Sequence, residues 1–208
     1  MQLNSEKAYH LIKEKIICLE LAPSSVIDEH ALMEELALGR TPIREALRRL
    51  SDETLVNIVP RRGMFVADIS ITDLQQIFEV RIILAGFCAR LAAERATQDQ
   101  IAQMEAVLRE LDQVQDGDSK ALIAIDRQFQ KLLYRAAGNA FLAETLNRLY
   151  DLSLRLWYLV LPRLGDVQGA ILQHREVVKA LRSADGVRAE TLIQRHITGF
   201  QQGIKAVL

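Results

Sequence analysis

Arginine is concentrated at the start of one predicted helix, where its charge is locally unfavourable. In the segment GRTPIREALRRL (39–50), Thr41 followed by Pro42 is typical of a helix start, with a hydroxyl N-cap and proline at the first helical position. Arg40 and Arg44 flank that start, although a helix N-terminus disfavours cations by roughly 0.3–1 kcal/mol each. A partner with negative charge, such as DNA phosphate, would satisfy both the arginines and the helix N-terminus.

Further arginines extend this basic region. Arg44 and Arg48 are four residues apart and share a face of the predicted helix, and two more arginines stand in PRRG (60–63). Six arginines and three acidic residues lie between positions 40 and 62, whereas the net charge of the whole chain is −1. A solvated surface helix would explain the arginines of one helix, but a second basic segment beside it favours contact with nucleic acid.

The elements that must position these residues form two groups. Apolar spacing predicts short helices over 5–19, 28–36 and 39–50, followed by strands over 55–59 and 64–69. Longer helices follow, over 73–95, 98–115, 119–137, 140–161, 166–183 and 187–205. We therefore expect a mainly α protein with a winged helix-turn-helix over residues 1–70 and an antiparallel six-helix bundle over 71–208. The enclosed centre of such a bundle is a common place for a ligand pocket.

Composition bounds the class of protein. The chain has 208 residues, 50% hydrophobic and 25% charged, which is ordinary for a globular protein. The first residues lack the pattern of a secretion signal, and no apolar run approaches the roughly 20 residues that span a bilayer. Cys18 and Cys88 have no CxxC spacing, so buried free thiols in a reducing compartment are expected. We expect a cytoplasmic protein with no membrane partner.

The motifs of this chain also resemble those of a known family. LMEELALGRTPIREALRRLSDETLVNIVPRRGMFV (32–66) closely resembles the recognition region of GntR-family bacterial transcription regulators. The helical remainder resembles the FCD effector domain of the FadR subfamily, in its shorter, VanR-like branch with six helices. The resemblance implies a homodimer that binds a roughly palindromic operator and whose DNA affinity is altered by a ligand in the helical domain. It places the DNA contacts on Arg40, Thr41, Arg44, Arg62 and Gly63, and we add Arg48 as a backbone contact on the same helix.

The sequence departs from the family pattern at several positions. His30 stands where the family often has an arginine that contacts phosphate, Ala37 stands at the turn glycine, and Gly39 stands at the usual serine. Thr54 occupies a glycine position after the recognition helix. If that position needs a positive φ, threonine is strained there.

The resemblance also implies a metal site. The FCD family commonly holds a metal with one aspartate and three histidines, and Asp126, His174 and His196 match those ligands. Gln130 stands in place of the first histidine, four residues after Asp126 and on the same helix face. Such a set would suit Zn²⁺, Ni²⁺ or Mn²⁺, although an amide oxygen is a far weaker ligand than imidazole. Two alternatives stay open: these side chains hydrogen-bond an organic ligand directly, or they are ordinary core residues.

Two arginines are candidate effector contacts. Arg81 matches a family arginine that reads a carboxylate, and an arginine within an otherwise apolar helix face needs an anionic partner. An internal ion pair, for example with Asp126, is the alternative. Arg155 is a second candidate, with a solvated charge as its alternative. Together with a metal, Arg81 predicts a small organic acid as the effector.

We therefore predict a ligand-responsive transcription regulator, a repressor rather than an enzyme. A metal-dependent enzyme that uses Asp126, His174 and His196 to activate water is one alternative. An architectural DNA-binding protein with a filled, pocketless bundle is the other.

Overall fold

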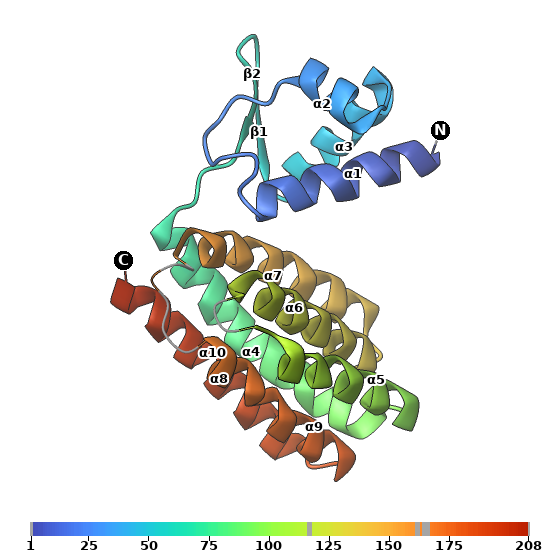
Figure 1. The fold of residues 1–208 in the computed structure, drawn as a ribbon, viewed down its shortest axis with the longest axis vertical. Coiled ribbons are helices and arrows are strands. Elements are labelled where there is room, and N and C mark those ends of the chain that lie inside the picture. Colours follow the sequence, from blue (N-terminus) through green and yellow to red (C-terminus); the bar gives the residue numbers. More distant parts are fainter. Residues whose placement is uncertain (1, 116–117, 161–162, 164–166, 208) are drawn as a thin grey trace. The chain divides into compact units, whose positions relative to one another are not determined.

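The computed structural model describes residues 2–115, 118–160, 163 and 167–207 (Figure 1). The predicted helix ends at residues 161 and 166 lie outside this part of the chain. The chain forms two compact units: Met1–Leu74 with Asp151–Leu159, and Gln75–Tyr150 with Val160–Leu208.

The N-terminal part of the first unit, up to Val66, contains three helices and a hairpin, as the sequence predicts. The helices are α1 (Gln2–Ile17), α2 (Glu29–Leu36) and α3 (Arg40–Asp52), and the strands are β1 (Val56–Val59) and β2 (Gly63–Val66). The strands are antiparallel, in a register that runs from Val56↔Val66 to Val59↔Gly63. The expected winged helix-turn-helix is confirmed, with strands shorter than predicted because pairing ends at these residues.

Apolar side chains from all of these elements form the core of the first unit. In α1, Ile12 and Ile16 are fully buried at a spacing of one helical turn. In α2, Leu32 is buried, and the helix begins at Asp28, whose carboxylate accepts hydrogen bonds from the backbone N–H groups of His30 and Ala31. The core members from α3 are Ile43, Ala46, Leu47 and Leu50.

The predicted N-cap of α3, Thr41, was wrong by two residues. The helix begins at Arg40, its N-cap is Gly39 with extended backbone, and no side chain caps it. The carbonyl oxygen of Gly39 accepts the first helical hydrogen bond, from the N–H of Ile43, so Thr41 lies inside the first turn. Pro42 fits there too, because the first four N–H groups of a helix have no partner within it.

The second unit is made of helices, and the predicted mainly α fold class is confirmed. Its elements in chain order are α4 (Ile71–Arg95), α5 (Gln98–Arg109), the 3₁₀ turn η1 (Glu110–Gln113), α6 (Ser119–Ala136), α7 (Ala140–Val160), α8 (Val167–Leu172), α9 (His174–Arg182) and α10 (Gly186–Val207). A capping box of Thr97 and Gln100 begins α5.

Two predicted helices are interrupted. The expected helix over 98–115 leaves α-helical geometry after Arg109 and ends in η1. The expected helix over 166–183 is divided at Gln173 into α8 and α9. There the N–H of Glu176 bonds to the carbonyl oxygen of Gln173, three residues back, which tightens the chain into a turn. His174 consequently lies at the very start of α9.

Helix α6 buries both apolar and polar residues. Phe129 and Leu133 are fully buried, as its strong apolar periodicity predicts. Asp126 and Gln130 are buried on the same helix, where polar groups are costly unless they have partners. None of the helices in the described part of the chain has an apolar stretch long enough to cross a bilayer.

Candidate DNA-binding and ligand-binding sites

Helix α3 turns one face to the core and the other to solvent. Because its apolar residues point inward, the four predicted contact residues of this helix are exposed: Arg40, Thr41, Arg44 and Arg48. The helix N-terminus, with its unpaired N–H groups, lies among them. The structure thus brings together the features of the sequence that favour binding to phosphate.

Arg49, on the same helix, has an internal role. Its Nη1 lies 2.7 Å from Glu6 Oε2, and its guanidinium carbon lies 4.0 Å from the centre of the Tyr9 ring. Both partners belong to α1, so Arg49 holds α1 against α3. Of the six arginines between positions 40 and 62, this one therefore belongs to packing.

The wing residues lie at an exposed, tight turn. Arg62 and Gly63 are both exposed, and the N–H of Arg62 donates to the carbonyl oxygen of Val59. Gly63 has φ 108°, a conformation that favours glycine, and Arg61 before it has φ 62°. The turn sequence therefore matches its backbone at Gly63 and is strained at Arg61.

The departures from the family pattern have local consequences. Ala37 has φ 51° and Thr54 has φ 63°, so both positions have the left-handed backbone that glycine adopts most easily. His30 is exposed and lies 3.5 Å from Glu34, one turn along α2. Position 54 therefore has the positive φ at which threonine is expected to be strained.

A polar cluster is buried in the second unit, and five helices contribute to it. Its members are Arg81 from α4, Asp126, Gln130 and Tyr134 from α6, Tyr150 from α7, His174 from α9 and His196 from α10. Each of them is at most 6% exposed. Arg81 and the four residues matched to the family's metal site are all members.

Asp126 is the centre of this polar cluster. Its Oδ1 lies 2.6 Å from His174 Nε2, and its Oδ2 accepts a hydrogen bond of 2.7 Å from the Tyr150 hydroxyl. Burial acts to raise the pKa of Asp126, but the hydrogen bond and charge of His174 hold that pKa well below its usual range. Burial, together with the Asp126 charge, raises the pKa of Tyr150 well above its usual value, which keeps the phenol protonated as a donor.

His196 presents a lone pair toward Asp126. Its Nδ1 lies 3.2 Å from the carbonyl oxygen of Ala170, which can only accept, so Nδ1 carries the proton. Its Nε2 lies 3.8 Å from Asp126 Oδ1. Burial and the nearby His174 lower the pKa of His196 to about 3, so the ring is neutral and Nε2 is a potential ligand.

The donor set fits a divalent metal. Ligand atoms from Asp126, His174 and His196 all lie within 4.8 Å of one another. A carboxylate with two imidazoles is a usual set of metal ligands. A backbone carbonyl that accepts from the other ring nitrogen, as Ala170 does from His196, commonly orients such an imidazole. Gln130 is fully buried, and neither its Oε1 nor its Nε2 has a hydrogen-bond partner among the described residues.

Arg81 has no ion pair within the described residues. Its guanidinium carbon lies 4.7 Å from the centre of the Tyr150 ring, and its Nε has no hydrogen-bond partner there. The Tyr134 hydroxyl forms no hydrogen bond of good geometry among the described residues, and burial raises its pKa to about 12 against the opposing effect of the nearby Arg81. The alternative ion pair from Arg81 to Asp126 is not formed, because the Asp126 oxygens bond to His174 and Tyr150. A buried cation thus lacks its anion.

Arg155 lies in the part of α7 that belongs to the first unit. It is buried, and its guanidinium donates a hydrogen bond to the backbone carbonyl of Ala67. Burial lowers the pKa of Arg155 to about 10. The expected alternative of a solvated charge is wrong, and the effector role of Arg155 stays a prediction.

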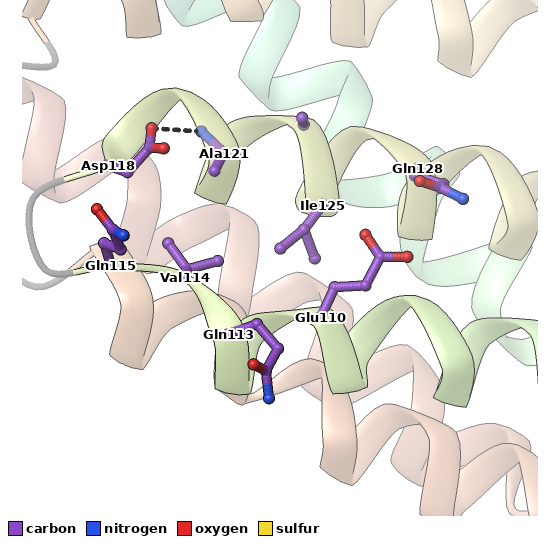
Figure 2. Close-up of a pocket in the computed structure, with 9 residues that line it drawn as sticks. Glu110, Gln113, Val114, Gln115, Asp118, Ala121, Ile125 and Gln128 are labelled. Atoms are coloured by element: carbon purple, nitrogen blue, oxygen red, sulfur yellow. Dashed lines mark hydrogen bonds between the residues drawn. The ribbon is translucent and has the colours of Figure 1, made fainter.

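A separate cavity of about 300 Å³ opens between η1 and α6 (Figure 2). Its lining residues are Glu110, Gln113, Val114, Gln115, Asp118, Ala121, Ala124, Ile125 and Gln128. Asp118 is occupied as the cap of α6, through a 3.0 Å hydrogen bond from the N–H of Ala121. None of the predicted site residues lines this cavity.

Three residues that sequence reasoning missed take part in these sites. Tyr134 and Tyr150 belong to the polar cluster, but each reads in the sequence as an ordinary aromatic residue of a buried helix face. Glu29 contacts the arginines of α3, as described below, from fifteen residues before Arg44. Only Tyr134 had a usable signal, since it lies eight residues after Asp126 and four after Gln130 on one helix face.

A winged helix-turn-helix with an exposed basic helix, followed in the chain by helices that enclose a polar cluster, is typical of a DNA-binding regulator. Comparison with known families agrees. Residues 4–66 match the family described as bacterial regulatory proteins, gntR family, and residues 76–199 match the FCD domain. The chain belongs to the GntR family of bacterial transcription regulators and carries an FCD domain.

Individual relatives are distant but cover nearly the whole chain. The HTH-type transcriptional repressor RspR of Escherichia coli (strain K12) is 23% identical over 207 residues, covering 98% of this chain and 90% of its own. The HTH-type transcriptional repressor GlaR of the same organism is 28% identical over 206 residues, covering 95% and 94%. The solved structure of E. coli McbR/YncC is similar in fold, with a TM-score of 0.88 at 20% identity and coverage of 98% and 97%.

Proposed function

We propose that the protein is a ligand-responsive repressor that binds a palindromic operator as a homodimer and is controlled by a small carboxylate in the second unit. The buried Arg81, without an ion pair among the described residues, is the observation that carries the carboxylate assignment. A buried charge without a partner is costly, so a bound anion is the expected complement. Two relatives named as repressors support the sign of regulation.

The first unit would bind DNA through α3 and the wing. Exposed Arg40, Thr41, Arg44 and Arg48 are suited to the major groove, where arginine pairs with guanine or with phosphate. Arg62 and Gly63 at the hairpin tip would contact the backbone beside the groove. This division predicts base preference from α3 and general affinity from the wing.

A divalent metal is one arrangement for the polar cluster. Asp126, His174 and His196 would hold Zn²⁺, Ni²⁺ or Mn²⁺, and the unpartnered Oε1 of Gln130 is the further oxygen available to it. When bound, the ion would supply positive charge for the oxygens of the effector carboxylate. Arg81 would then orient the same carboxylate through its planar guanidinium.

Direct binding of the effector is the second arrangement, and a specific observation favours it. Both oxygens of Asp126 already accept hydrogen bonds, from His174 and Tyr150, so the carboxylate is satisfied without a cation. Gln130, Tyr134 and Arg81 would then hydrogen-bond the effector themselves, because each has a polar atom without a described partner.

A homodimer would cover an apolar stripe on α4. Val80, Ile83 and Phe87 are 48%, 66% and 38% exposed and follow one another at helical spacing. A second copy of the chain with the same stripe would bury them and supply the second α3 for a palindromic site.

Because the operator lies on the chromosome, we place the protein in the cytoplasm.

Two measurements test this proposal. Elemental analysis of untagged protein, with Asp126→Ala as control, decides between the two arrangements: near-stoichiometric metal lost in the variant supports the first. A duplex selected from a random DNA library should then bind the wild type and be released by a member of a carboxylate panel. Arg81→Ala should keep DNA binding and lose that release. Failure to select any duplex, DNA affinity insensitive to every carboxylate, or turnover of a carboxylate would contradict the proposal.

A further inference from the structure

Glu29, the first residue of α2, lies against the exposed arginines of α3. Its Oε2 is 2.8 Å from Arg44 Nε, and its Oε1 is 3.4 Å from Arg44 Nη2. The same Oε2 lies 3.9 Å from Arg40 Nε. The Glu29 side chain is only 22% exposed, whereas that of Arg44 is 55% exposed. Part of this acidic group is therefore packed beneath a residue that we assign to DNA.

The two hydrogen bonds fix the plane of the Arg44 guanidinium. Five N–H groups lie in that plane, and Glu29 occupies the one on Nε and one on Nη2. The two N–H groups on Nη1 and the second on Nη2 are left for another partner. A pair of parallel N–H groups, one from each terminal nitrogen, is what the O6 and N7 acceptors of guanine require.

A carboxylate beside Arg44 is unfavourable for DNA affinity. It repels DNA phosphate and neutralises part of the positive charge of Arg40 and Arg44, which should weaken binding to every sequence. The same carboxylate is favourable for the orientation of the Arg44 guanidinium, because an exposed arginine otherwise samples many rotamers. Position and charge together point to discrimination among bases.

We propose that Glu29 is a positioning residue that holds Arg44 for reading guanine, and that it sets base preference at some cost in general affinity. The inference rests on the proposed contact of Arg44 with a base. It names a second residue, outside α3, on which the specificity of the regulator depends.

A purely structural tie between α2 and α3 is the competing explanation. The two helices already share a core through buried Leu32 and Leu47, and α2 has its own cap in Asp28. An ion pair with an exposed partner adds little to stability. If the pair were nevertheless a structural tie, its loss would lower the melting temperature and leave base preference unchanged, whereas loss of a positioning residue does the reverse.

The experiment is selection of duplexes from a library with a random central region, followed by competition binding at one salt concentration. Glu29→Gln keeps the shape of the side chain and removes its charge. Glu34→Gln is the matched control, since it removes one charge from the same helix and Glu34 pairs only with His30 in the described contacts. Arg44→Ala identifies the base pair that Arg44 reads, as the position whose preference it erases.

We expect Glu29→Gln to lower the preference at that base pair by about tenfold, with binding to random-sequence duplex unchanged or tighter. Glu34→Gln should retain the preference, and both variants should melt with the wild type. If Arg44→Ala erases a preference that Glu29→Gln retains, the positioning role is overturned while the Arg44 contact stands. If Arg44→Ala erases nothing, or no duplex is enriched, the proposed contact fails and this inference with it. Equal losses in the two glutamine variants would reduce the effect to general charge and also overturn it.

Discussion

The basic face of α3 and the polar cluster of the second unit use polar residues in opposite ways. On α3, the arginines are exposed, and their positions follow from the helical repeat of a single segment. In the polar cluster, residues from five helices are buried and depend on one another for hydrogen bonds. Changes on the first surface should affect binding and spare the fold, whereas changes in the second should affect both.

The two regions also differ in what satisfies them. The arginines of α3 have water and internal carboxylates as partners, so they can exchange these for DNA at modest cost. Arg81 is 4% exposed and has no ion pair among the described residues, so under the proposed function an effector carboxylate would be its counterion. The basic face of α3 therefore needs no further partner for stability, whereas the polar cluster contains a buried cation without a described anion.

The largest effect should come from removing the centre of the polar cluster. Asp126→Ala leaves the Tyr150 hydroxyl and the His174 ring buried without an acceptor, and we expect a loss of about 3–5 kcal/mol in the free energy of unfolding. Urea titration in the presence of a chelator measures it without a metal contribution. Asp126→Asn retains an acceptor of the same size and should lose less. A loss in the alanine variant no larger than in asparagine would show that the cluster does not depend on this carboxylate.

The corresponding change on α3 should leave the free energy of unfolding nearly unchanged. Arg44→Ala removes a side chain that is 55% exposed and should weaken binding to the selected duplex by roughly 1–3 kcal/mol with relaxed base preference. Fluorescence anisotropy on matched and mismatched duplexes measures this. Arg49→Ala, five residues along the helix and on another face, is the control, because Arg49 pairs with Glu6 and should not alter base preference. Equal effects of the two variants would remove the distinction between contact and packing residues.

The sequence predicts the basic face of α3 better than the polar cluster, because the first depends on one segment and the second on five helices. The wing and α3 were predictable, because helix period, turn residues and charge are local properties of one segment. Even there, the start of α3 was missed, since Thr41 looks like a better cap than Gly39 and only the backbone decides. Glu29 could not be assigned, because its contact with Arg44 depends on how α2 packs against α3.

The polar cluster could be predicted only where the helix period or the family pattern reached. Asp126 and Gln130 share a helix face by their spacing, whereas His174 and His196 came from the resemblance alone. Tyr150, which fixes one oxygen of Asp126, lies twenty-four residues away on another helix and carries no signal in the sequence. The break at Gln173 that sets His174 at a helix start was also missed, because helical periodicity continues across it.

Restoring a histidine in the polar cluster should sharpen its metal chemistry. Gln130→His replaces an amide without a described partner by an imidazole, and we expect Zn²⁺ or Ni²⁺ to bind about tenfold or more tightly than to the wild type. Isothermal titration calorimetry measures the affinity. Gln128→His, on the exposed side of the same helix, is the matched control and should have no effect. Equal tightening by both variants would mean that the metal binds at the surface and that Asp126, His174 and His196 form no site.

The smallest expected effect concerns the turn that follows α3. Thr54 has φ 63°, which costs a residue with a branched side chain about 1 kcal/mol or more relative to glycine. Thr54→Gly should therefore raise the free energy of unfolding by about 1 kcal/mol, less whatever the hydrogen bond from its hydroxyl to the Glu53 carbonyl contributes. Thr145→Gly, at an exposed position inside α7, makes the same substitution in helical geometry and should lower the free energy of unfolding by roughly 0.3 kcal/mol. If both variants are destabilised alike, threonine does not strain the left-handed turn. The departure from glycine at position 54 then does not lower the free energy of unfolding.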